Sequence, residues 1–301
     1  MNKSDWTGVI PAITTPFNAD LSIDLAFLAK HANWMIDAGC RGIVAPGSLG
    51  EGGTLSREEK TDLWETLVAA VGPRVPVIAA SSALSTDEAV HSAKDAHAAG
   101  CRGLMVLPPY VYRGEWREIR GHFAAVLRAT PLSCMLYNNP IAYGTDTLPE
   151  QVADLASEFA NLHAIKESSA DVRRLTAIKA LIGSRLELLV GVDDLIVEGV
   201  AAGATGWIAG LVNAFPKESV ALYDLSRAGR WKDAAALYAW FLPLLRMDVV
   251  PEFVHLIKLV QQEVGMGSER VRPPRLVLHG AKREAALSTL RHAMATRPTL
   301  V

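Results

Sequence analysis

The sequence of 301 residues lacks long hydrophobic runs: none of its apolar stretches approaches the roughly 18 residues that a membrane-spanning helix needs. Cysteine is also scarce, and the three cysteines, Cys40, Cys101 and Cys134, lie far apart without the spacing of metal ligands. Residues 1–5 are polar and contain no apolar signal segment. We therefore expect a soluble, cytoplasmic protein with reduced thiols and no membrane partner.

Neither sign of charge is in clear excess, because 30 basic residues stand against 32 acidic ones and the net charge is -2. The basic residues form no blocks and do not alternate with aromatic residues, so nothing indicates nucleic acid as a partner. The histidines are isolated and none has ligand spacing, so we expect no metal site and no cofactor. Half of the residues are hydrophobic, which is ample for a large core.

What the sequence does contain is a regular alternation of short apolar runs with longer stretches of helical period. The eight apolar runs cover residues 9–14, 42–45, 77–80, 103–107, 134–137, 163–166, 186–190 and 206–209. The helical stretches cover residues 24–38, 57–71, 86–99, 115–129, 149–157, 171–182, 193–202 and 217–227. Ser56 with Glu59 and Ser85 with Glu88 have the spacing of helix caps.

Eight strand–helix units in about 225 residues favour a (β/α)8 TIM barrel, because a doubly wound open sheet normally uses five to seven strands. We assign residues 1–227 to the barrel. Beyond them the pattern is purely helical, with candidate helices at residues 231–245, 251–264 and 281–295. We therefore expect residues 228–301 to form a C-terminal helical extension packed on the barrel.

In such barrels the active site lies at the carboxyl ends of the strands, so the residues after each apolar run are the candidates. The second run is followed by Gly47, Ser48, Leu49, Gly50 and Glu51. The consecutive amides of this turn and the Ser48 hydroxyl suit the binding of a carboxylate. Glycine-rich turns after strands are often only turns, and that interpretation stays open for this segment alone.

Lys166 ends the sixth apolar run and is the only cation in it. Partial burial disfavours the ammonium form, which makes a neutral amine available to attack a carbonyl and form a Schiff base. The alternative is a lysine that leaves the strand end for solvent or pairs with Glu167.

Other polar groups follow the neighbouring runs. Tyr137 and Asn138 end the fifth, and Gly191, Asp193 and Asp194 follow the seventh. Tyr137 suits proton transfer, although a core aromatic residue is its alternative, and the two aspartates suit either substrate hydroxyls or the cap of the next helix. Together with the glycine-rich turn and the lysine, these groups suit a 2-oxo acid: the turn binds its carboxylate and the lysine attacks its ketone.

The order and spacing of these segments resemble the dihydrodipicolinate synthase and N-acetylneuraminate lyase family of class I aldolases. The resemblance covers about residues 9–275 and includes residues 47–51, 137–140, 165–167 and 191–194. It implies a Schiff base on Lys166, a proton relay through Tyr137 and Ser48, and a homotetramer or homodimer. It adds Tyr110 and Ile208 to the expected substrate-binding residues.

Several positions depart from the family pattern. Leu49 stands where relatives commonly have threonine, and Ala142 stands where the synthase branch has an arginine for the carboxylate of its second substrate. Paired tyrosines of the synthase are replaced by Tyr110 with Tyr112 offset by one, so which of them completes the relay stays open. Trp207 either adds bulk near the active site or faces outward from the barrel.

These departures favour a Schiff-base lyase that dehydrates, deaminates or cleaves a small 2-oxo acid or its cyclic imine, such as a 2-keto-3-deoxy sugar acid or a hydroxy-pyrroline carboxylate. One alternative is 4-hydroxy-tetrahydrodipicolinate synthase, which joins pyruvate and aspartate semialdehyde. A second, of another class, is a barrel that only binds a 2-oxo acid. Substrate length, stereochemistry and reaction direction are beyond what the residues specify.

Overall fold

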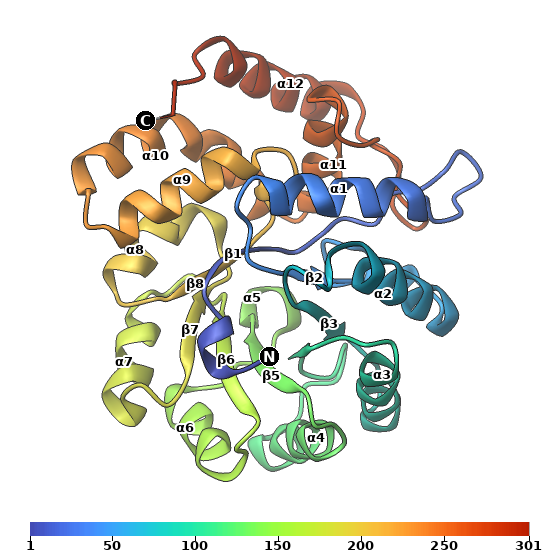
Figure 1. Cartoon of the computed structure of the whole chain (residues 1–301), viewed down its shortest axis with the longest axis vertical. Helices are drawn as coiled ribbons and strands as arrows, with labels where there is room; N and C mark the ends of the chain where they lie inside the picture. The colour runs from blue at the N-terminus through green and yellow to red at the C-terminus, as the bar shows by residue number, and fades with distance from the viewer. Residues whose placement is uncertain (301) are drawn as a thin grey trace.

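The computed structural model describes residues 1–300, and eight parallel strands form its centre (Figure 1). The strands are β1 (Gly8–Pro11), β2 (Ile43–Ala45), β3 (Val77–Ser81), β4 (Gly103–Val106), β5 (Ser133–Asn138), β6 (Leu162–Glu167), β7 (Glu187–Val190) and β8 (Gly206–Ala209). They pair in the order β1-β8-β7-β6-β5-β4-β3-β2. A bridge between Ala12 and Val44 joins the two ends of this order, so the sheet closes into the expected TIM barrel.

A helix follows each strand on the outside of the barrel (Figure 1). These helices are α1 (Leu25–Asp37), α2 (Arg57–Val71), α3 (Thr86–Ala98), α4 (Trp116–Arg128), α6 (Pro149–Glu158), α7 (Arg173–Ile182), α8 (Ile196–Ala201) and α9 (Pro216–Arg227). The expected caps form, since Ser56 accepts from the Glu59 amide and Ser85 from the Glu88 amide. The helix expected from residue 193 begins only at Ile196, because residues Asp193–Leu195 form a 3-10 turn.

One short helix, α5 (Pro140–Tyr143), was not expected from the sequence. Asn139 caps it, since its side-chain oxygen accepts from the Ala142 amide at 3.0 Å. Proline at the first helical position suits this start, and Gly144, with φ +71, ends the helix in the left-handed conformation. The helix lies directly after β5, at the carboxyl end of the barrel, which we call the mouth.

Strand residues alternate between two cores. Inside the barrel lie Ile10, Val44, Ile78, Met105, Met135, Ala164, Leu189 and Ile208, whereas their strand neighbours pack outward against the helices. Trp207 belongs to the outer set and is fully buried there. Its outward interpretation is therefore right, and the idea that it adds bulk near the active site is wrong.

After α9, the chain is helical: α10 (Trp231–Leu245), α11 (Phe253–Glu263) and α12 (Gly280–Ala295) pack on the side of α1, α8 and α9 (Figure 1). A 3-10 turn, Arg246–Asp248, joins α10 to α11 and contacts the turn Asp193–Leu195 that follows β7. The tail thus reaches the mouth. That residues 228–301 form a unit distinct from the barrel stays a prediction. Among residues 1–300, no helix has both the length and the apolar character to cross a membrane.

Candidate active site

Lys166 occupies an inward position near the end of β6, two residues after the inward Ala164. Its side chain is buried, and Nζ lies 4.0 Å from the centroid of the Tyr137 ring. Within residues 1–300, this Nζ makes no hydrogen bond or ion pair. The lysine stem needs glycine beside it, because a Cβ on Gly191 would lie 2.4 Å from the Lys166 Cε.

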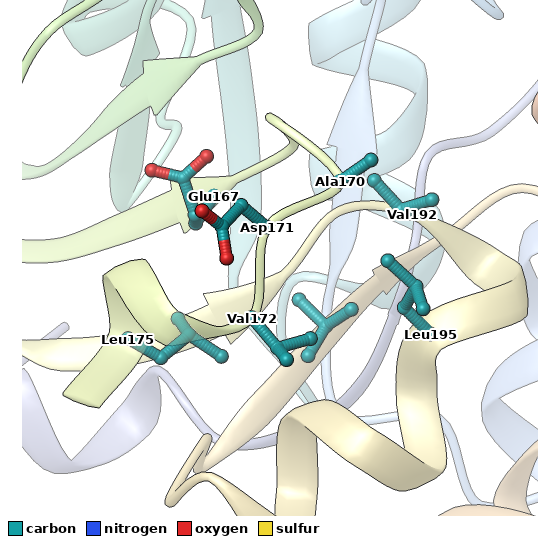
Figure 2. A pocket seen from close by; sticks show the side chains of 8 residues that line it. Glu167, Ala170, Asp171, Val172, Leu175, Val192 and Leu195 are labelled. Carbon is teal, nitrogen blue, oxygen red and sulfur yellow. The ribbon is translucent and has the colours of Figure 1, made fainter.

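Glu167 does not pair with this lysine, because the next residue of a strand points to the opposite face. Its carboxylate accepts from the Asn138 side chain at 3.1 Å and from the Ser169 amide at 2.7 Å. Figure 2 shows Glu167 lining a small pocket together with Asp171, Val172 and Leu175, between the barrel wall and the helices. Lys166 does not line that pocket, which therefore differs from the site at the mouth.

Tyr137 lies beside Lys166 because the two residues are register partners on β5 and β6. Its hydroxyl accepts a hydrogen bond from the Asn139 side chain at 3.0 Å. The ring packs edge-on against Tyr143 of α5, with 5.7 Å between the centroids. The Tyr137 ring is thus in contact with both Lys166 and Tyr143, while its hydroxyl is bonded to the Asn139 side chain.

Tyr143 connects Tyr137 to the glycine-rich turn. Its hydroxyl forms a short hydrogen bond with the Ser48 hydroxyl, and its ring stacks on Tyr110 with 5.3 Å between the centroids. Burial raises the pKa of Tyr143 well above its ordinary value, and Tyr137 and Tyr110 raise it further. Tyr143 is therefore a neutral hydroxyl that can both donate and accept a hydrogen bond.

Tyr143 was not among the residues expected from the sequence. It lies on α5, which is too short to show a helical period. The sequence left open whether Tyr110 or Tyr112 completes the relay. Within one protomer, Tyr110 is the one that contacts Tyr143. Tyr112 is 51% exposed and is directed to Glu118, whose hydrogen bond and charge raise its pKa.

The glycine-rich turn after β2 leaves the amides of Ser48 and Leu49 free of its own hydrogen bonds. The turn is closed by bonds from the Glu51 amide to the Ser48 carbonyl and from the Gly52 amide to the Gly47 carbonyl, both 3.1 Å. The amides of Ser48 and Leu49 are not used in this way. Glycine is needed at position 50, because a Cβ there would lie 2.9 Å from the carbonyl oxygen of Ile13, which follows β1. The Leu49 side chain is buried.

Glu51 corrects one expectation, because its side chain turns away from the mouth. One carboxylate oxygen accepts from Lys258 Nζ at 2.5 Å, and the other accepts from the Arg272 amide at 3.0 Å. Both partners belong to the C-terminal tail. Glu51 thus anchors the tail to the turn, and nothing in the spacing of the sequence indicates partners more than 200 residues away.

The two aspartates after β7 also differ from expectation, since they do not face the mouth as a pair. Asp193 is fully buried and accepts from Trp207 Nε1 at 2.9 Å, from the Leu211 amide at 2.8 Å and from the Gly210 amide at 3.1 Å. Burial raises its pKa to about 6, although these donors and Lys166 act in the opposite direction. It therefore holds the chain after β8 and does not cap the next helix.

Asp194 lies 3.6 Å from Arg246 of the tail, and so its carboxylate is directed to the surface between barrel and tail. Asn138 is likewise outward: its amide nitrogen donates to Glu167, and its oxygen accepts from the Thr147 amide at 2.9 Å. Both side chains contact other parts of the protein, and their expected contact with substrate stays a prediction. Ile208 does face the barrel interior. Among residues 1–300, no group of three or more His, Cys, Asp or Glu side chains could hold a metal ion.

Residues 5–293 match the dihydrodipicolinate synthetase family. The chain belongs to that family. It is 33% identical over 289 residues to 4-hydroxy-tetrahydrodipicolinate synthase of Geotalea daltonii, covering 95% of this chain and 98% of the relative.

Solved structures of the family share the fold. A dihydrodipicolinate synthase of Bacillus anthracis superposes with a TM-score of 0.92 at 30% identity, over 99% of this chain and all of that one. The synthase of Acinetobacter baumannii, solved with pyruvate, has a TM-score of 0.91 at 29% identity and covers 96% and 99% of the two chains. The protein is therefore an enzyme, a lyase of this family of class I aldolases.

Proposed function

We propose that this enzyme forms a Schiff base between Lys166 and a small 2-oxo acid, or its cyclic imine, and then dehydrates, deaminates or cleaves it. One observation carries the proposal. Lys166 is a buried amine with no partner among residues 1–300, and a phenol lies against it. Because an unpaired buried cation is costly, such a lysine favours reactions that convert it to a neutral or covalently bound form.

The surrounding groups supply the other requirements of imine chemistry. The free amides of Ser48 and Leu49 are donors for the substrate carboxylate, which places the ketone carbon toward Lys166. Attack by the amine gives a carbinolamine, and loss of water gives the imine. Tyr137 then moves the protons, and the hydrogen-bonded hydroxyls of Tyr143 and Ser48 lie beside it, between its ring and the glycine-rich turn.

The residues around α5 support a substrate without a second carboxylate at this position. Ala142 is exposed on α5 and brings no charge, and Leu49 brings an apolar side chain to the turn. An aldehyde that carries its own carboxylate would find no guanidinium at residue 142. A charge-assisted hydrogen bond of that kind is worth about 1.5–3 kcal/mol, so its absence lowers affinity about 10- to 150-fold.

A second candidate is 4-hydroxy-tetrahydrodipicolinate synthase, because the curated relatives carry that name. One feature of the chain favours it. The guanidinium of Arg113 lies over Gly144, where a Cβ would lie 2.2 Å from the Arg113 Nε. A positive charge therefore does lie next to α5, although it comes from the loop after β4 and from an exposed side chain.

Borohydride reduction in the presence of pyruvate tests the imine. We expect one covalent adduct, on the peptide that contains Lys166, and none on the peptide with the other buried lysine, Lys258. Adduct formation in Lys166→Ala would overturn the assignment. Steady-state assays then separate the two candidates: a kcat/KM for pyruvate plus aspartate semialdehyde of about 10⁴ M⁻¹s⁻¹ or more identifies the synthase.

We also propose that the enzyme is a homodimer or homotetramer. Four large apolar side chains at the mouth are exposed: Leu84, Val111, Tyr112 and Ile141. They follow the adjacent strands β3, β4 and β5, and a second copy of the chain would cover them. Sedimentation should show an oligomer that Val111→Asp with Ile141→Asp converts to a monomer, whereas a monomeric wild type would contradict this proposal.

A further inference from the structure

One carboxyl group at the mouth has no partner. Asp248 ends the 3-10 turn between α10 and α11, and its carboxyl lies directly over Gly210, which follows β8. A Cβ on Gly210 would lie 2.0 Å from the Asp248 Oδ1. This oxygen is closed to solvent, and the side chain makes no hydrogen bond or ion pair within residues 1–300. A buried polar group without a partner needs an explanation, and a ligand is one.

The position of Gly210 places this carboxyl inside the barrel mouth. Along β8, Ile208 faces the interior while Trp207 and Ala209 face outward, so Gly210 is the next inward position. Gly191 holds the corresponding inward position after β7, and the Ser168 hydroxyl and the Lys166 stem fill its space. The two glycines thus admit an amine from β6 and a carboxyl from the tail into neighbouring places.

The charges around Asp248 favour its neutral form. Burial raises the pKa of Asp248 well above its ordinary value, Asp193 and Asp194 raise it further, and Lys166 acts in the opposite direction. Arg246, on the same turn, is directed to Asp194. Asp248 therefore carries a proton under conditions in which ordinary carboxyls have lost theirs.

Asp193, the other buried carboxyl near Lys166, differs in a decisive way. Its oxygens already accept from one indole and two amides, all of the barrel. The Asp248 Oδ1, in contrast, is buried and has no hydrogen-bond partner among residues 1–300. Of the two, Asp248 is the one available to a substrate atom.

We propose that Asp248 is a catalytic acid, which donates its proton to the oxygen that leaves carbon 4 of the substrate. The inference rests on the proposed function and narrows it to β-elimination from a 4-hydroxylated 2-oxo acid. The base path through Tyr137 takes a proton from carbon 3 of the imine and leaves an enamine. The nitrogen lone pair then re-forms the C2=N bond, and the C2=C3 pair moves to form C3=C4.

In the same step the C4–O bond breaks, its electron pair stays on oxygen, and the oxygen takes the proton of Asp248 and leaves as water. Asp248 remains as a carboxylate. Hydrolysis of the conjugated imine returns Lys166 and releases a 2-oxo-3-enoic acid. The proton removed from carbon 3 restores the Asp248 acid by way of solvent, so that the net change is the loss of one water molecule.

A leaving-group experiment tests this role. The probes are 4-hydroxy-2-oxopentanoate and 4-chloro-2-oxopentanoate, which give the same product, 2-oxopent-3-enoate, but chloride leaves without a proton. Asp248→Asn should slow elimination of the hydroxyl by about 10²- to 10⁴-fold, the range for a general acid. It should raise the ratio of chloride to hydroxyl elimination by about 10²-fold or more.

Wild-type hydroxyl elimination should also decline as the pH rises through the pKa of Asp248, and this limb should be absent in Asp248→Asn. Asp248→Ser is the second variant, and borohydride trapping of pyruvate on Lys166 checks that each variant retains a functional fold. An unchanged ratio of the two rates would overturn the role of Asp248. So would wild-type enzyme that traps pyruvate but eliminates neither group, or that only cleaves the C3–C4 bond. Failure of wild-type enzyme to trap any 2-oxo acid would instead remove the proposed function itself.

Discussion

Two lysines of this chain are buried over aromatic rings, and only one of them is paired. Lys166 lies 4.0 Å from the ring centroid of Tyr137 at the barrel mouth, and Lys258 of α11 lies 4.3 Å from that of Phe17. Lys258 donates to a Glu51 oxygen at 2.5 Å and to the Arg270 carbonyl at 2.7 Å. Lys166 has no such acceptor among the described residues.

The difference separates a lysine that holds the fold from one that is available for chemistry. Burial lowers the pKa of Lys258 to about 8, although Glu51 opposes this change. Its proton is fixed between two acceptors, and its nitrogen lone pair is therefore withheld from any carbonyl. Lys166 Nζ instead faces the ring of Tyr137 and has no hydrogen-bond acceptor among residues 1–300. Burial alone does not make a lysine reactive; burial without a hydrogen-bonding partner does.

The largest effect should come from replacing each lysine by methionine, which keeps the stem and removes the charge. Lys166→Met should lower kcat by more than about 10⁴-fold, because the nucleophile is gone. Its thermal unfolding should remain near that of wild type or shift upward, since an unpaired buried charge is removed. Turnover assays and calorimetry measure the two quantities. A Lys166→Met variant that unfolded several degrees earlier would mean that Lys166 also has a structural partner.

The next prediction makes the surroundings of Lys166 resemble those of Lys258. Tyr137→Phe keeps a ring beneath the amine, as Phe17 lies beneath Lys258, and removes only the hydroxyl. We expect kcat to fall by about 10²- to 10⁴-fold with a small change in KM, because the hydroxyl transfers protons and the ring does the packing. Steady-state kinetics on any substrate trapped by Lys166 provides the check, and near-normal turnover would assign the proton transfer to another group.

Lys258→Met should have the opposite profile to Lys166→Met. It leaves the buried Glu51 carboxylate with Arg275, 3.8 Å away, as its remaining cation, and loss of the close partner costs up to about 3–5 kcal/mol of folding free energy. Denaturant unfolding measures this loss, with Lys94→Met on the exposed face of α3 as the control, expected within about 0.5 kcal/mol of wild type. The double variant Lys258→Met with Glu51→Met should recover much of the loss. If it does not, the pair is not the source of the stability.

The barrel could be predicted because its signals are local. Each strand is a short apolar run ended by a turn residue, and several helices begin at a cap that lies within four residues of its partner, as Ser56 does with Glu59. The α5 helix escaped prediction because four residues, Pro140–Tyr143, are too few to show a helical period. Tyr143 escaped with it.

The direction of a side chain was predictable where a strand end sets it, as for Lys166 and Tyr137, whose catalytic roles stay predictions. It was not predictable where distant segments decide. Glu51 lies in the turn after β2, on the same side of the barrel as Lys166. Its side chain nevertheless contacts Lys258, which is 207 residues away in the sequence. Asp248 reaches the mouth from a tail turn that has no strand of its own. The spacing of residues along the sequence predicts neither the contact of Glu51 with Lys258 nor that of Asp248 with Gly210.

His31 extends the comparison to a third way of burying a basic group, which is to leave it uncharged. Its Nε2 donates to the Asn213 carbonyl at 2.8 Å, and burial lowers its pKa to about 4. An unfolded histidine binds a proton below about pH 6.5, whereas the folded one does not until about pH 4, so stability is full above pH 6.5 and is lost as the pH falls toward 4. The shift corresponds to about 3 kcal/mol.

The variant His31→Gln retains a donor for the Asn213 carbonyl and does not titrate. The difference in unfolding free energy between wild type and this variant should therefore shrink by about 3 kcal/mol from pH 7 to pH 4. A difference that stays constant across this range would show that His31 is not the group whose protonation weakens the fold.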